Sequence, residues 1–196
     1  MRMFHLVSVT AMVLLFTACK TKEKKDAVKF VSVQSLIEQQ AAHIDTSLYS
    51  IRKIVTHDSL HSDTSFIARE KFREAAKEFL EIPDLSDPKI ARRFKEESRY
   101  DTLIKRVIIT YIPLDAQKEE IKKQELVVST QLDNNGYNKV TNIIVDRVIN
   151  NRDGFKSQQM LWRMDKSFLI ITTTQKPGEP EVATTTKVAW NEEDLQ

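Results

Sequence analysis

The stretch LIKRVIITYI (residues 103–112) decides the predicted fold, because it opens a series of segments rich in β-branched and aromatic residues. Similar segments follow at residues 126–132, 140–149, 155–164, 168–174 and 182–190. Turn signals containing Asn, Asp, Gly or Pro separate most of them, such as Asn135-Gly136. Connections this short cannot cross over between parallel strands. The sequence therefore predicts about six meandering antiparallel strands over residues 103–191.

The distribution of apolar residues predicts how this sheet is buried. Met160, Trp162 and Met164 share one face of the fourth segment, so that face is expected in the core. In the third segment Ile144 and Val145 place apolar side chains on both faces. Such two-sided strands predict helices on one face and curling, a tail or a partner on the other. The turn after residue 132 fits two registers that differ by one residue, and the sequence leaves that choice open.

Three helices are predicted ahead of the strands. An apolar pattern with steps of four and three residues predicts the first over residues 36–56. A second is predicted over residues 65–80, and a third, with Pro88 at its first position, over residues 88–99. The seam of the first helix favours packing on the sheet over a coiled coil, because it stops before a fourth heptad. This order predicts an α+β domain, with about three N-terminal helices in residues 35–99 packed on a curved antiparallel sheet.

The first residues are predicted to be an export signal. Arg2 precedes an eleven-residue apolar segment, residues 6–16, which is too short to span a bilayer. The sequence Phe16-Thr17-Ala18-Cys19 that follows resembles a bacterial lipobox, in which the cysteine is lipidated when the leader is cut off. Phe16 departs from the commonest pattern, which has Leu there. The alternatives are an ordinary secretory peptide or an uncut anchor. The resemblance implies three parts: a cleaved signal peptide (1–18), a lipidated Cys19 with a flexible tether (19–33), and a single domain (34–196).

Cys19 is the only cysteine in the chain. If it is acylated, no thiol remains for a disulfide, a metal site or nucleophilic catalysis. Lys20 follows it, rather than the Asp that retains enterobacterial lipoproteins at the inner membrane. By analogy we expect attachment to the periplasmic face of the outer membrane, through the lipid on Cys19.

Composition excludes several function classes. The chain has 30 basic and 28 acidic residues, a formal net charge of +2. This charge balance lacks the excess of basic residues that is typical of nucleic-acid-binding proteins. Its three glycines all lie in predicted turns, so there is no phosphate loop or dinucleotide motif, and no cofactor is predicted. His57 and His61 are only weak candidates for a metal site, because no Glu follows His57 and the segment reads as a loop.

Asp146 and Arg147 lie in the two-sided third segment, so at least one of these charges is expected to be half buried and to need a partner. The partner is expected to be either the polar group of a ligand or a cross-strand ion pair with Lys123, Glu125 or Arg163.

These observations predict a lipid-anchored envelope protein that is not an enzyme and that acts as a binding or assembly module, with an envelope protein as its partner. The alternative is a small-molecule or lipid carrier, with an apolar pocket between helices and sheet. By architecture alone, that arrangement resembles the nuclear-transport-factor-2-like cone and the half-barrels of lipoprotein carriers. The pocket candidates are the large apolar residues expected to face this space: Phe72, Phe79, Phe94, Met160, Trp162 and Met164.

Overall fold

The computed structural model describes residues 30–57, 61–132 and 135–191. The first described elements are a helix and a hairpin: α1 (Val33–Thr46), β1 (Ile51–Thr56) and β2 (Ser62–Ile67). A 3₁₀ turn and three four-residue helices follow: η1 (Arg69–Lys71), α2 (Phe72–Ala75), α3 (Lys77–Leu80) and α4 (Pro88–Ala91).

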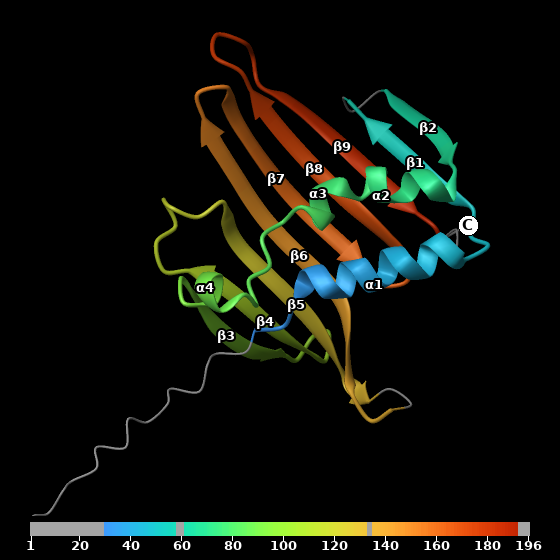
Figure 1. Cartoon of the computed structure of the whole chain (residues 1–196), viewed down its shortest axis with the longest axis vertical. Helices are drawn as coiled ribbons and strands as arrows, with labels where there is room; N and C mark the ends of the chain where they lie inside the picture. The colour runs from blue at the N-terminus through green and yellow to red at the C-terminus, as the bar shows by residue number, and fades with distance from the viewer. Residues whose placement is uncertain (1–29, 58–60, 133–134, 192–196) are drawn as a thin grey trace, which may run out of the picture.

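Seven further strands complete the described chain: β3 (Phe94–Asp101), β4 (Arg106–Pro113), β5 (Ile121–Leu132), β6 (Asn138–Asn151), β7 (Gly154–Arg163), β8 (Ser167–Gln175) and β9 (Val182–Ala189). All nine strands form one antiparallel sheet in the order β2-β1-β9-β8-β7-β6-β5-β4-β3 (Figure 1). Strands β3 to β9 pair with their neighbours in sequence, and the β1–β2 hairpin is added next to β9.

The predicted fold of about three helices on six strands is therefore wrong. The six predicted strands correspond to β4 to β9, but three more strands come from segments that the apolar pattern assigned to helices. The first predicted helix, 36–56, ends at Thr46, and its last residues form β1. The second, 65–80, begins inside β2, and the third, 88–99, contains only α4 before β3 starts.

Strand pairing explains the error in the first predicted helix. Ile51 and Val55 fit a helical seam, but they also fit the alternation of a strand. In the structure β1 lies between β2 and β9, with Arg52 opposite both Phe66 and Ala189, so its backbone groups have partners on both sides. Leu48, which a continuous helical seam would bury, is 96% exposed. Pairing in the sheet thus overrides the local helical pattern.

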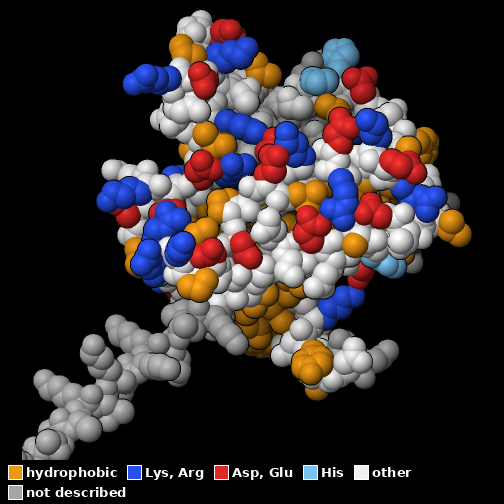
Figure 2. Space-filling model, in the orientation of Figure 1, with side chains coloured by type: hydrophobic (Ala, Val, Ile, Leu, Met, Phe, Trp, Pro, Cys, Tyr) orange, Lys and Arg blue, Asp and Glu red, His pale blue; other side chains and the backbone are white. Residues whose placement is uncertain are grey.

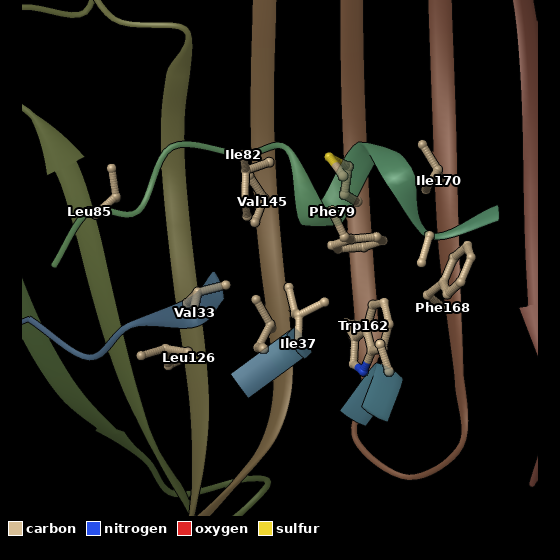
Figure 3. Close-up of a cluster of buried hydrophobic side chains, with 14 of the residues drawn as sticks. Val33, Ile37, Phe79, Ile82, Leu85, Leu126, Val145, Trp162, Phe168 and Ile170 are labelled. Carbon is tan, nitrogen blue, oxygen red and sulfur yellow. The ribbon is translucent and has the colours of Figure 1, made fainter. Parts of the chain in front are cut away.

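Helices α1, α2 and α3 cross one face of the sheet, which we call the covered face (Figure 1). Its core is a cluster of buried aromatic rings: Phe72, Phe79, Trp162, Phe168 and Trp190. The rings of Phe79 and Trp162 meet edge to face with centroids 5.1 Å apart, and those of Phe72 and Trp190 at 5.2 Å. Figure 3 shows Phe79 pointing from α3 toward Trp162 and Phe168 on the sheet. This cluster holds the short helices against the strands.

Helix α1 is also fixed by a pair of hydrogen bonds to the β7–β8 turn. The backbone N–H of Asp165 donates to Gln40 Oε1 at 2.7 Å, and Gln40 Nε2 donates to Asp165 Oδ1 at 2.8 Å. Asp165 has a φ of 62°, a left-handed conformation that Asp tolerates better than most residues. The pair sets the position of α1 across the sheet, while Ile37, Ala41 and Ile44 supply its buried face.

Gly154, the first residue of β7 after the β6–β7 turn, is required by both its backbone and its surroundings. Its φ is +137°, and a Cβ at this position would stand 2.5 Å from the carbonyl oxygen of Gln175. We expect Gly154→Ala to lower the free energy of unfolding by roughly 2–4 kcal/mol, because backbone strain and the clash add together. Urea unfolding of the two proteins measures this difference.

Gly136 provides the matched control. Its φ is +80°, but a Cβ there would meet no heavy atom within 4 Å. Gly136→Ala should therefore cost only about 1 kcal/mol, the penalty of a left-handed residue. Equal decreases in the free energy of unfolding for the two variants would contradict a close approach between position 154 and the Gln175 carbonyl oxygen.

Candidate functional site

The structure brings four of the six pocket candidates together. Phe72, Phe79, Met160 and Trp162 lie in the core under α2 and α3, and each is almost fully buried. The space between these helices and the sheet is filled by the side chains themselves, whose rings are in contact. The other two belong to the same hydrophobic core but lie outside this group. Phe94, at the start of β3, lines a separate pocket of about 240 Å³, and Met164 is half buried after β7.

A second group on the covered face is polar, and we call it the Glu78 cluster. It consists of side chains from α3, β6, β7 and the chain before β5: Glu78, Glu120, Arg147, Lys156 and Gln158. Lys156 Nζ lies 2.7 Å from Glu78 Oε1, and a guanidinium nitrogen of Arg147 lies 3.7 Å from Glu78 Oε2. Arg147 also donates to Glu120 Oε2 from two nitrogens, at 2.8 and 3.2 Å. Each charge in the cluster thus has an opposite charge beside it.

The Glu78 carboxylate is stabilised in its ionised form. Burial raises its pKa, but the hydrogen bond and charge of Lys156, the amide of Gln158 and the charge of Arg147 lower it, so that the net pKa lies below the ordinary value. An ionised, fully paired carboxylate has no proton to give and little basicity. The cluster therefore links α3 to the sheet through ion pairs.

The opposite face of the sheet, which we call the open face, carries an unexpected apolar groove. Figure 1 shows the described helices α1, α2 and α3 on the other side of the strands. Ile144, Leu161 and Leu169 stand side by side on β6, β7 and β8, and Ile171 lies on the next row of β8 with 36% of its surface exposed. These four residues line a groove of about 340 Å³, together with Lys123, Asp146, Gln159 and Met160.

Charged groups border this open-face groove at one end. Lys123 Nζ lies 3.4 Å from Asp146 and 3.2 Å from Glu125. The cross-strand ion pair predicted for Asp146 is confirmed, with Lys123 as its partner. Arg147 points to the covered face and pairs with Glu120 and Glu78 instead of any residue that the sequence suggested.

Among the described residues, the histidine candidates do not form a metal cluster. His57 follows β1 and is exposed, with its Nε2 3.9 Å from Asp63. Within residues 30–57, 61–132 and 135–191, no three His, Cys, Asp or Glu side chains gather in a way that could hold a metal ion. None of the helices in these ranges is long and apolar enough to cross a bilayer. Cys19, the predicted lipidation site, lies outside the described residues.

Comparison with known proteins adds no relative: no protein family, curated protein or solved structure matches the chain. Function must therefore be inferred from the chain's own residues.

Sequence reasoning missed most of the Glu78 cluster and the buried Gln124, and it undervalued one apolar residue. Gln124 on β5 is 1% exposed, and neither atom of its amide hydrogen-bonds to a described protein group. No sequence signal distinguishes it from the lysines and glutamate around it. Leu161 did carry a signal, because it is an apolar residue between Gln159 and Arg163 on the polar face of the fourth predicted strand. In the structure it lies in the middle of the open-face groove.

The depressed pKa of Glu78 gives a pH-dependent prediction. A folded pKa below 4.5 means that the carboxylate stabilises the fold above that pH and loses its contribution as the pH falls through the folded pKa. We expect Glu78→Gln to cost at most about 1 kcal/mol at neutral pH, because the side chain is about a third exposed. The difference from the wild type should shrink below pH 4.5, as measured by urea unfolding across a pH series.

Glu74→Gln is the control, because Glu74 forms only an exposed pair with Lys71. This substitution should change the free energy of unfolding only slightly at every pH. A Glu78→Gln difference that stays constant down to low pH would show that the lost interaction is not that of an ionised carboxylate.

Proposed function

We propose that this protein is a lipid-anchored protein of the bacterial cell envelope, at the periplasmic face of the outer membrane, and that it binds a protein partner without catalysing a reaction. The anchor is supported by the Phe16-Thr17-Ala18-Cys19 motif and by the charged, tether-like segment that follows it. The binding role is supported above all by the open-face groove.

The open-face groove has the properties of a protein contact. Its apolar side chains come from three neighbouring strands, so they are held on a rigid scaffold rather than on loops. They are half buried by each other but remain accessible, and burying such a contiguous apolar surface against a partner is favourable. Lys123 and Asp146 at its border can orient the partner through polar contacts.

The carrier alternative has less support. A carrier needs a cavity for its cargo between helices and sheet. At Phe72, Phe79 and Trp162 that space is occupied by closely packed rings, and a ligand could enter only by displacing them. The open-face groove is shallow and lies on the other side of the sheet, which suits a protein surface better than an enclosed small molecule.

A photo-crosslinking amino acid at Ile171, on the edge of the groove, tests the binding role in cells. We expect a discrete crosslinked species of higher mass, and we expect Leu161→Lys to reduce its yield tenfold or more, as about 1.4 kcal/mol of lost binding would do. Leu161 is only half buried, so the thermal melting of this variant should change little.

The matched control places the same amino acid at Leu48, which is exposed but lies after α1, away from the groove. It should give no such species. Crosslinking from position 171 that is unaffected by Leu161→Lys would exclude the groove as the contact.

Replacement of the lipobox cysteine tests the anchor. Cells grown with radiolabelled palmitate should label the wild-type chain and the conservative variant Thr17→Ser. Cys19→Ser should remain unlabelled and keep its leader, because the acceptor thiol is gone. Palmitate incorporation that persists in Cys19→Ser would refute lipidation at this residue.

A further inference from the structure

Exposed apolar side chains gather at the tips of two hairpins. Among the described residues, eleven large hydrophobic side chains are exposed, and five of them lie in or beside the β3–β4 and β5–β6 connections: Tyr100, Leu103, Ile104, Leu132 and Tyr137. Leu103 is 92% exposed and Tyr137 is 72% exposed. We call these five residues the tip patch.

The two hairpin tips are neighbours in space. Strands β4 and β5 are paired as far as Arg106 opposite Ser129, and Thr130 Oγ1 donates to the carbonyl oxygen of Lys105 at 3.3 Å. Both connections therefore leave the same end of the sheet. Figure 2 shows hydrophobic side chains on the lower side of the molecule, beneath α1 and on the β5–β6 hairpin.

At the β3–β4 tip, a side chain accepts hydrogen bonds from the backbone N–H groups of two exposed apolar residues. Asp101 Oδ1 accepts hydrogen bonds from the backbone N–H groups of Leu103 at 3.0 Å and of Ile104 at 3.3 Å. Lys105 completes the turn with a φ of 51°. A bilayer strongly disfavours backbone groups without hydrogen bonds, so a tip whose N–H groups are already bonded can enter the interface at low cost.

Charge distinguishes this end of the sheet from the other. The turns at this end, residues 101–106, 132–138 and 163–167, contain three acidic and four basic residues. The turns at the opposite end of the strands, residues 114–120, 151–154 and 175–181, contain six acidic and three basic residues. Aromatic, aliphatic and basic side chains together suit the headgroup region of a membrane, and an anionic surface repels the acidic end.

The chain outside the described structure is long enough to permit this contact. The described chain begins at Phe30, whose ring stacks on Tyr111 at 4.4 Å, and Val31 N–H donates to the Tyr111 hydroxyl at 3.0 Å. Tyr111 lies six residues from Lys105 along β4, which is roughly 20 Å. The ten residues between Cys19 and Phe30 can extend to roughly 35 Å. A lipid on Cys19 and the tip patch can therefore reach one bilayer together.

We propose that the tip patch contacts the surface of the membrane that holds the protein, so that the β3–β4 and β5–β6 ends of the strands face the bilayer. This inference rests on the proposed lipid anchor. Its consequence is a fixed orientation, in which the acidic turns point away from the bilayer.

A probe experiment on the full chain tests this orientation. An environment-sensitive fluorophore is attached to a cysteine introduced at Leu103, and in a second protein at Val182, which is exposed at the start of β9 at the other end of the sheet. Acylation leaves Cys19 unreactive toward the dye. Each protein is reconstituted into vesicles of phosphatidylethanolamine and phosphatidylglycerol. We expect the emission at position 103 to shift to shorter wavelength and to lose access to an aqueous quencher, while position 182 remains in water.

Three results would overturn the proposal: no shift at position 103, an equal shift at both positions, or a shift at 103 only after envelope proteins are added. The last result would assign the patch to a protein partner. The intact mass of each preparation reports acylation separately. If Cys19 proves to be unmodified, the lipid anchor fails, and the same probe in a Cys19→Ser background still decides whether the tips meet the bilayer.

Discussion

The contact between the aromatic rings of the short helices and those of the sheet is the interaction on which the rest of the structure depends. α2 and α3 have four residues each, too few to be stable alone, so they persist only because Phe72 and Phe79 are buried against Trp162, Phe168 and Trp190. The same contact fills the space between α2, α3 and the sheet. The candidate binding surfaces therefore lie outside the aromatic core, on the open face and at the hairpin ends.

Much of the sheet could be predicted from sequence, and the reason is local. Strands β4 to β9 pair with their neighbours in the chain, so alternation and turn residues were sufficient to place them. The Pro177-Gly178 pair suits a type II turn, and in the structure Gly178 has a φ of 80° and Glu179 N–H donates to the Lys176 carbonyl. Strand β1 could not be predicted this way, because it depends on β9, which lies more than a hundred residues away.

The candidate site was less accessible to sequence reasoning. Large apolar residues were assigned to a pocket because a sequence does not show whether side chains line a space or fill it. In the structure Trp162 is fully buried and helps to fill the space between the helices and the sheet. The double-sided character of β6 predicted helices on one face and curling, a tail or a partner on the other. In the structure Ile144 lies in the open-face groove, on the side away from α1, α2 and α3. The tip patch gave no signal, because Leu103 and Ile104 looked like the start of a strand rather than the end of a hairpin.

The pairing of β1 with β9 also constrains when this fold can form. During synthesis β1 and β2 are made early, whereas β9, which pairs with the other edge of β1, is the last described strand to be made. The β1–β2 hairpin therefore cannot join the rest of the sheet until Ala189 has been made. Trp190, part of the aromatic core, arrives later still. The aromatic core therefore stays incomplete until the last described residues have been made.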